Sequence, residues 1–396
     1  MPLRHWMQLA LTSGLGPTLI KRIVDCLGSA QNACDASVPQ LQRIDGLGPA
    51  RAHDMHAAGR AAAADATAEL ARAQQLGVWL TCPDDAVYPV LLNSIATPPP
   101  VLYVKGTLEP RDLNAVAIVG SRRCTYYGRE QAERFAALLA GAAFTVVSGG
   151  ARGVDSSAHR GALQHPQGRT IAVLGCGADV VYPPENQPLF DQIQQRGAIV
   201  SEFPLGTQPR PDNFPRRNRV ISGLSRGVLV VEADERSGAL ITARYAGEHG
   251  RTIFATPGRV DNPLSAGPHQ LIRDGALLTA RLEDIIENLG PLPADVIDGD
   301  AAGQREPVEL FEPPSGKAPP APLPTLTPRQ QRVLAEMSAD PASVDQLVDR
   351  SGLEAGVVLQ ELTFLSLKGL VKRIDGQTYA LQAREHGRTA AGPGGR

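Results

Sequence analysis

Apolar residues follow two different spacings along this chain of 396 residues, and the change of spacing divides the chain into parts. Residues 1–75 are rich in alanine and place apolar residues at helical spacing, which predicts a helical domain. Residues 76–290 alternate short apolar runs with helical stretches, the pattern of an α/β domain. Helical spacing returns over residues 327–383, after a segment without periodicity.

Nine apolar runs in the middle part predict β-strands. They are residues 78–81, 101–104, 116–120, 145–148, 170–175, 198–201, 227–232, 252–256 and 276–279. Most of the later runs are uninterrupted stretches of apolar residues with a polar residue only at an end, as expected for parallel strands that are buried on both faces. Helices are predicted between strands, for example over 129–142 and 240–248. The fold predicted for this part is therefore α/β with a mostly parallel sheet.

The helical domain carries two Gly-Leu-Gly-Pro turns, at residues 14–17 and 46–49, which predict paired helical hairpins. In helix-hairpin-helix modules such turns present backbone N–H groups to a DNA phosphate. The same sequences also simply end helices, and Asp45 in the second turn would repel a phosphate. Both interpretations stay open.

The C-terminal part begins with residues 291–326, whose Pro, Gly, Asp and Glu content predicts a mobile linker. Helices predicted over 328–337, 344–351 and 355–368, with a hairpin over 371–380, make residues 327–383 a winged helix. Its third helix is rich in leucine and poor in basic residues, so an interaction module fits as well as a DNA reader. Residues 384–396 are predicted to be disordered.

Composition restricts the class of protein. No N-terminal stretch resembles a secretory signal and no run of about 18 apolar residues occurs, so we predict a cytoplasmic protein without a membrane segment. The five cysteines form no Cys-x-x-Cys pair, which argues against a zinc ribbon or a disulfide framework. We predict neither a metal nor a cofactor.

The net charge of −2 gives no general sign of nucleic-acid binding, but it hides a local basic patch. Between residues 206 and 226 there is a single acidic residue, Asp212, against five arginines. A cationic patch of this kind is a candidate contact for phosphates.

Four loops that follow predicted strands carry the candidate chemistry, because open α/β sheets bind ligands at the carboxyl ends of their strands. The first, GSRRCTYYG (120–128), and the second, SGGARGVDSSAH (148–159), combine glycines, hydroxyl groups and arginines at helix entrances. Such loops hold anions on backbone N–H groups near a helix N-terminus. Tight turns alone would also explain the glycines. The candidate residues in these two loops are Ser121, Arg122, Gly149, Gly150 and Arg152.

The third loop, FPLGTQPRPDNFPRRNR (203–219), places Phe203 and Phe214 among arginines in a chain with only 4% aromatic residues. Single strands are bound by a cationic groove together with side chains on which bases stack, and this loop supplies both. The alternative is a proline-braced loop whose phenylalanines belong to the core. The fourth loop, EADERSGALITAR (232–244), places Ser237 and Thr242 at another helix start, where a further phosphate would fit.

An enzyme is the competing interpretation. Neither Gly120 nor Gly175 begins a complete dinucleotide-binding fingerprint, and no metal-ligand spacing occurs. Asp155 and His159 lie four residues apart and form a possible acid/base pair, although a capping aspartate and a structural histidine are commoner. Glu202 and Glu232 end two predicted strands and with Arg122 would be the candidates for hydrolysis of a nucleotide.

With these motifs in view, the chain resembles the DNA-processing protein A (DprA/Smf) family over nearly its whole length. The resemblance rests on long motifs in order, from IVGSRRCTYYG at residue 118 and SGGARGVDSSAH at 148 to SEFPLGTQPRPDNFPRRNRVISGLS at 201 and VVEADERSGALITAR at 230. It implies an extended Rossmann-like core between a sterile-alpha-motif-type helical domain and a winged helix. It also implies a homodimer, without catalytic activity, that binds incoming single-stranded DNA and helps to load a RecA-type recombinase during natural transformation.

The resemblance also implies a DNA pocket. Besides the residues of the first two loops, the pocket would use Arg210, Asn213, Phe214, Arg217, Asn218 and Arg219. The sequence departs from the family pattern at residues 267–269, where Gly-Pro-His stands in place of Gly-Thr-Asn or Gly-Cys-Asn. This departure concerns the nearby turn and a dimer or recombinase surface beside it, whereas the pocket motifs are unaffected.

Overall fold

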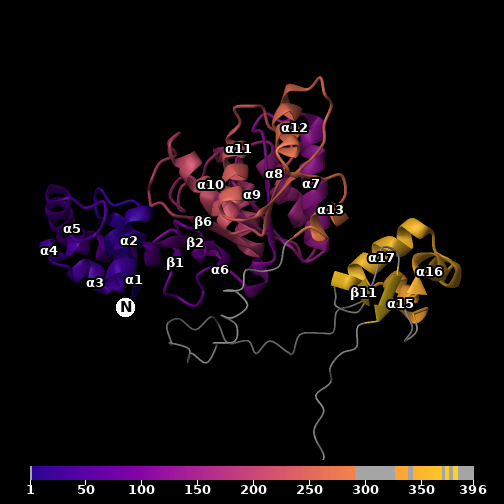
Figure 1. The fold of residues 1–396 in the computed structure, drawn as a ribbon, viewed down its shortest axis with the longest axis horizontal. Coiled ribbons are helices and arrows are strands. Elements are labelled where there is room, and N and C mark those ends of the chain that lie inside the picture. The colour runs from indigo at the N-terminus through magenta and orange to yellow at the C-terminus, as the bar shows by residue number, and fades with distance from the viewer. Residues whose placement is uncertain (1, 290–325, 338–341, 368–370, 374–377, 382–396) are drawn as a thin grey trace, which may run out of the picture. The chain divides into compact units, whose positions relative to one another are not determined.

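The computed structural model describes residues 2–289, 326–337, 342–367, 371–373 and 378–381 (Figure 1). It divides into two compact units, residues 1–303 and 304–396. The predicted linker, apart from residue 326, and the predicted disordered tail lie outside the described residues. The finer division into five ranges stays a prediction.

A nine-stranded sheet forms the centre of the first unit, in the order β1-β2-β6-β5-β4-β3-β7-β8-β9. All pairs from β6 to β9 are parallel, whereas β2 pairs antiparallel with both β1 and β6. The strands are β1 (Trp79–Thr81), β2 (Leu102–Gly106), β3 (Ala115–Val119), β4 (Thr145–Ser148), β5 (Arg169–Leu174), β6 (Ala198–Ser201), β7 (Gly227–Val230), β8 (Thr252–Ala255) and β9 (Leu277–Leu278). All nine predicted strands are found, and the predicted mostly parallel α/β fold is confirmed.

Helices cover both faces of this sheet (Figure 1). On one face α7 packs against α8 and α8 against α9, while on the other α10 packs against α6 and α11. They are α6 (Val90–Asn93), α7 (Tyr126–Gly141), α8 (Val154–Gln164), α9 (Gln187–Arg196), α10 (Asn213–Gly223), α11 (Gly238–Glu248), α12 (Ala266–Arg273) and α13 (Leu282–Ile286), with 3-10 turns η1 (Pro110–Leu113), η2 (Pro184–Asn186) and η3 (Pro263–Ser265). The apolar strands are buried because both of their faces meet helices.

The helices α7 and α8 approach each other closely at Gly161. A Cβ atom at this position would lie 2.1 Å from the carbonyl oxygen of Glu133, so a larger residue would push the helices apart. At the start of α8, a Cβ atom at Gly153 would lie 2.4 Å from the carbonyl oxygen of Ser121, so the loops that lead into α7 and α8 are also in close backbone contact.

Five helices precede the sheet: α1 (Pro2–Leu11), α2 (Pro17–Leu27), α3 (Ala30–Asp35), α4 (Val38–Leu41) and α5 (Pro49–Gln75). Their shared core includes Tyr103 and Leu205 from the α/β part. Gly16 and Gly48 of the two Gly-Leu-Gly-Pro turns are the N-caps of α2 and α5. At the second turn, the guanidinium of Arg22 donates to the carbonyl oxygen of Asp45 at 2.8 Å. This cation beside the turn therefore already has a partner within the protein.

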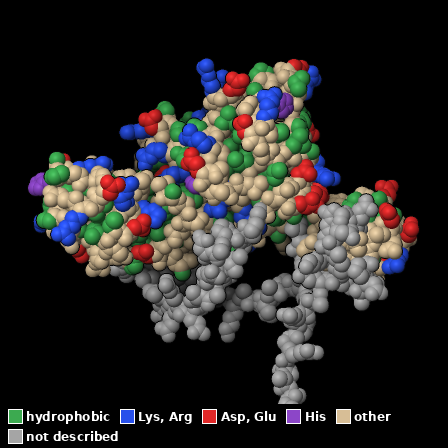
Figure 2. Space-filling view, in the orientation of Figure 1, with side chains coloured by type: hydrophobic (Ala, Val, Ile, Leu, Met, Phe, Trp, Pro, Cys, Tyr) green, Lys and Arg blue, Asp and Glu red, His purple; other side chains and the backbone are tan. Residues whose placement is uncertain are grey.

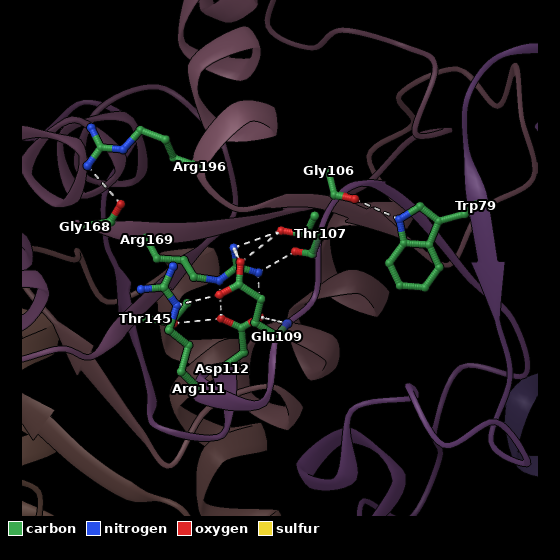
Figure 3. Close-up of polar contacts among 10 residues, drawn as sticks. All are labelled: Trp79, Gly106, Thr107, Glu109, Arg111, Asp112, Thr145, Gly168, Arg169 and Arg196. Atoms are coloured by element: carbon green, nitrogen blue, oxygen red, sulfur yellow. Dashed lines mark hydrogen bonds and ion pairs between the residues drawn. The ribbon is translucent and has the colours of Figure 1, made fainter. Parts of the chain in front are cut away.

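A buried arginine fixes the amino end of the central strands (Figure 3). The guanidinium of Arg169 on β5 is 3% exposed and donates to Asp112 at 2.6 and 2.8 Å and to Glu109 at 3.0 Å. Asp112 also accepts from the hydroxyl of Thr145 on β4 at 2.8 Å. Because Asp112 lies in η1 before β3, the cluster ties three neighbouring strands together at the edge opposite the candidate loops.

The second unit contains α15 (Pro328–Ala335), α16 (Val344–Ser351) and α17 (Ala355–Leu367) with strands β10 (Ala342–Ser343), β11 (Val371–Arg373) and β12 (Thr378–Leu381). The strands pair antiparallel in the order β10-β12-β11. Val358, Leu362 and Leu365 of α17 are buried in its core, whereas Leu359 is exposed. The predicted winged helix is confirmed as a fold.

Candidate nucleic-acid interface

The loops predicted to bind phosphate meet at the carboxyl edge of the sheet. Strand β3 pairs with β4 on one side and with β7 on the other, so the chain order reverses here and the sheet has its topological switch point. The backbone N–H of Ser121, two residues after β3, donates to the carbonyl oxygen of Glu232 after β7 at 2.6 Å. The first and fourth loops are thus joined directly.

The carboxylate of Glu232 holds the entrance of α7. It accepts from the backbone N–H and the hydroxyl of Thr125, both at 2.7 Å, and from the side chain of Asn262 at 3.2 Å. Thr125 in turn caps α7 by accepting from the N–H of Gly128 at 3.1 Å. Glu232 is 2% exposed, so this candidate catalytic carboxylate is committed to a structural contact.

Arg217 of α10 crosses the carboxyl edge beneath the second loop. It is 4% exposed, donates to the carbonyl oxygen of Gly149 at 2.6 Å, and donates to the carbonyl oxygen of Val173 in β5. Burial lowers the pKa of Arg217 to about 10, so it remains cationic at neutral pH. Burial raises the pKa of the nearby Asp155, and the charge of Arg217 opposes that rise.

Arg219 is the second buried arginine of α10. It forms an ion pair with Glu202, and both side chains are nearly inaccessible to solvent. Its other donor contacts the carbonyl oxygen of Thr97 at 2.6 Å. Burial raises the pKa of Glu202. Contacts of Arg217 and Arg219 with DNA stay a prediction, but their guanidinium groups already have internal partners.

Phe214 lies at the start of α10 and is only partly buried. The guanidinium of Arg122 lies over its ring, 4.7 Å from the centroid, and Tyr182 packs at 5.7 Å. The ring rests on Gly175 after β5, where a Cβ atom would lie 2.8 Å from it. Phe203, the other aromatic residue of this loop, is buried, so only Phe214 keeps part of its ring accessible; a stacked base on that ring stays a prediction.

The remaining predicted residues divide by exposure. Arg210 is exposed, and Arg152 is exposed and paired with Glu185. Asn218 is buried and donates to the carbonyl oxygen of Gly238 at 3.0 Å, while Ser237 caps α11 by accepting from the N–H of Ala239 at 3.3 Å. The buried or nearly buried members are Ser121, Gly149, Gly150, Asn213 and Thr242. The structure thus brings the predicted loops together but exposes only some of their polar groups.

A cleft between the N-terminal ends of α7 and α8 encloses about 310 Å³. Five arginines and one acidic residue, Glu185, are the charged groups that line it, and we call it the arginine cleft. The arginines are Arg122, Arg123, Arg129, Arg152 and Arg160. Only Arg122 and Arg152 of these were predicted as site residues from the sequence, although Arg129 and Arg160 each come directly after a predicted loop.

This concentration of charge is local. Figure 2 shows basic and acidic side chains interspersed over one face of the molecule, in keeping with the net charge of −2. The arginine cleft differs because its arginines outnumber its acids by four.

The buried His159 is unsuited to acid/base chemistry. The Thr170 hydroxyl donates to the carbonyl oxygen of Val146 at 2.6 Å, so it must accept from Nδ1 of His159, 2.7 Å away. The proton therefore sits on Nδ1, and Nε2 is buried and has no hydrogen-bond partner among the residues that the structure describes. Burial lowers the pKa of His159 to about 3.

We expect this histidine to make the fold acid-sensitive. Its pKa is lower in the folded state than the ordinary value of 6.5, so the unfolded chain binds the extra proton and stability falls as the pH drops below about 6.5. The expected contribution is about 2 kcal/mol between pH 6.5 and pH 5, measured by urea unfolding. The His159→Asn variant keeps a donor for Thr170 but does not titrate. Between pH 6.5 and pH 5 its free energy of unfolding should therefore fall by about 2 kcal/mol less than that of the unchanged protein. Equal slopes would contradict the assignment.

No group of histidine, cysteine and acidic side chains among the described residues is arranged to hold a metal ion. Nor does the described part of the chain contain a helix long and apolar enough to cross a membrane.

The fold and site define a doubly wound α/β protein with an arginine-lined cleft beside the carboxyl ends of β3 and β4, and with a separate winged-helix unit. Comparison with known sequences identifies the family. Residues 79–290 match the family described as DNA recombination-mediator protein A, and residues 317–377 match the DprA winged helix domain. The chain belongs to the DprA/Smf family.

Relatives match over much of their length. Protein Smf of Synechocystis sp. is 36% identical and aligns over 95% of this chain and 98% of its own, and Protein Smf of Escherichia coli is 40% identical over 76% and 77%. The crystal structure of DNA processing protein A from Streptococcus pneumoniae is similar with a TM-score of 0.64 and 34% identity, covering 73% of this chain and 98% of that one.

Proposed function

We propose that this DNA-processing protein binds single-stranded DNA without sequence preference, at the carboxyl edge of its sheet. The observation that carries the proposal is the placement of Arg122 over the ring of Phe214 beside the arginine cleft. A cation and a stackable ring at one spot supply the two contacts that single strands need, one for a phosphate and one for a base.

Within this site the residues have different tasks. Arg122, Arg152 and Arg210 are exposed and contact phosphates directly. Phe214 stacks one base. The buried members Arg217, Asn218 and Arg219 position α10 and the Gly149 loop, since their polar groups are bonded inside the protein. The predicted set also includes Ser121, Gly150, Asn213, Ser237 and Thr242, of which Asn213 begins α10 and Ser237 is the N-cap of α11.

We propose that the protein is not an enzyme. The alternative, hydrolysis of a nucleotide, requires a carboxylate that is free to act on water or substrate. Glu232 is bonded to Thr125 and Asn262, and Glu202 is paired with Arg219. Loss of turnover of a nucleoside monophosphate in Glu202→Gln or Glu232→Gln would support the alternative instead.

The proposed setting is the bacterial cytoplasm, where a homodimer of this chain receives incoming DNA and assists a RecA-type recombinase. The winged-helix unit serves as the interaction module: α17 contains no lysine or arginine and exposes Leu359. Deletion of residues 327–396 would then abolish partner binding and spare DNA binding.

Residues 267–269, where the sequence departs from the family pattern, form part of α12. In this segment the backbone N–H of Gly267 donates to the carbonyl oxygen of Ala233 at 2.9 Å.

Fluorescence anisotropy across a salt series tests the proposal. We expect the full chain to prefer a single strand to the matching duplex, with a log-log salt slope of about 0.7 per phosphate neutralised. Equal affinity for both forms, or none for either, would reject single-strand binding at this site.

A further inference from the structure

We infer that the arginine cleft receives the terminal phosphate monoester of a bound DNA strand, an inference that rests on the proposed single-strand binding. A groove for continuous DNA needs cations spread along a track. Here five arginines converge on a cleft of about 310 Å³, a volume at the small end of ligand sites. That geometry suits the end of a strand better than its middle.

The charge of the cleft exceeds the need of one backbone phosphate. An internal phosphodiester carries one negative charge, whereas a terminal monoester carries about −1.5 to −2 at neutral pH. Arg152 is paired with Glu185, and Arg122 lies over Phe214. Within the described part of the chain, the guanidinium groups of the other three arginines of the cleft have no hydrogen-bond or ion-pair partner.

The wall of the cleft adds a polar group that is also unsatisfied. Ser157, in the first turns of α8, is 2% exposed and lines the cleft, and its hydroxyl has no hydrogen-bond partner among the described residues. Its neighbour Ser156 differs, because it donates to the carbonyl oxygen of Ala151 at 2.6 Å and accepts from Asn186 at 2.9 Å. A phosphate oxygen in the cleft would accept from the Ser157 hydroxyl close to the positive end of α8.

The cleft is also continuous with the proposed base-stacking site. Arg122 lines the cleft, and its guanidinium lies 4.7 Å from the centre of the Phe214 ring, so a terminal nucleotide beside that ring has its own phosphate near the free arginines. The protein would thus recognise the end of a strand without reading its sequence.

The test compares short oligothymidylates that differ only at one end, measured by anisotropy with the full chain. A strand with a 5′-phosphate or a 3′-phosphate should bind about tenfold more tightly than the same strand with a hydroxyl at that end, because it gains charge-assisted hydrogen bonds. Whether the 5′-phosphate or the 3′-phosphate increases the affinity shows which end of the strand lies in the cleft, and therefore the direction in which the strand is bound.

Variants locate the effect. Arg129→Ala and Arg160→Ala should remove the preference for the phosphorylated end, while Arg134→Ala, an exposed arginine farther along α7, should keep it. Equal affinity for phosphorylated and hydroxyl ends would overturn the inference and leave the proposed function intact. A preference that survives both cleft variants would overturn it too. Absence of binding by every strand would instead reject the proposed function itself.

Discussion

Replacing Arg217 by methionine is expected to lower the free energy of unfolding by about 3–5 kcal/mol, since it removes a buried cation and leaves the buried polar groups around it without compensation. The side chain satisfies the carbonyl oxygens of Gly149 and Val173 and lies near the buried Asp155. Methionine has a similar length but no hydrogen-bond donor. The two buried carbonyl oxygens then lack a donor, and the carboxylate of Asp155 lacks a nearby positive charge. Urea unfolding at neutral pH measures the loss.

Two further variants separate this cause from a general effect of substitution in α10. Arg216→Met, the neighbouring and exposed arginine, should change stability by no more than about 0.5 kcal/mol. Adding Asp155→Asn to Arg217→Met should recover part of the loss, because the uncompensated carboxylate is then gone. An Arg217 variant as stable as the Arg216 variant would show that the buried guanidinium does not hold the edge of the sheet.

This contrast between adjacent arginines marks the limit of what the sequence predicts. The central strands β3 to β7 were predictable because an uninterrupted apolar run is the sequence pattern of a strand that is buried on both faces. The run Arg216, Arg217, Asn218, Arg219 reads as one basic patch. Its division into exposed and buried members depends on Glu202, Thr97 and other acceptors that are distant in the sequence.

The arginine cleft was only half predictable for the same reason. Arg122 and Arg152 lie within glycine-rich loops that follow strands, and this is a pattern that the local sequence shows. Arg129 and Arg160 belong to different helices, and they line one cleft only because α7 and α8 pack closely at Gly161. The approach of these two arginines depends on how the helices pack, and the spacing of residues within either helix cannot predict it.

The second large effect is expected for the pair formed by Arg122 and Phe214. Phe214→Ala should weaken single-strand binding by about 1–3 kcal/mol, the contribution of one stacked base, with the salt slope nearly unchanged. Arg122→Ala should reduce the magnitude of the log-log salt slope by about 0.7, since one phosphate contact is lost. Anisotropy across a salt series resolves both, and Arg134→Ala serves as the charge-matched control on an exposed position of α7.

The double variant tests whether the two residues form one site. Because the Arg122 guanidinium rests on the Phe214 ring at 4.7 Å, removal of the ring also removes the support that directs the cation toward a phosphate. The affinity lost in Arg122→Ala/Phe214→Ala should therefore be smaller than the sum of the two single losses. Strict additivity would mean that the ring and the cation contact DNA independently. Unchanged affinity in both single variants would place the DNA elsewhere on the protein.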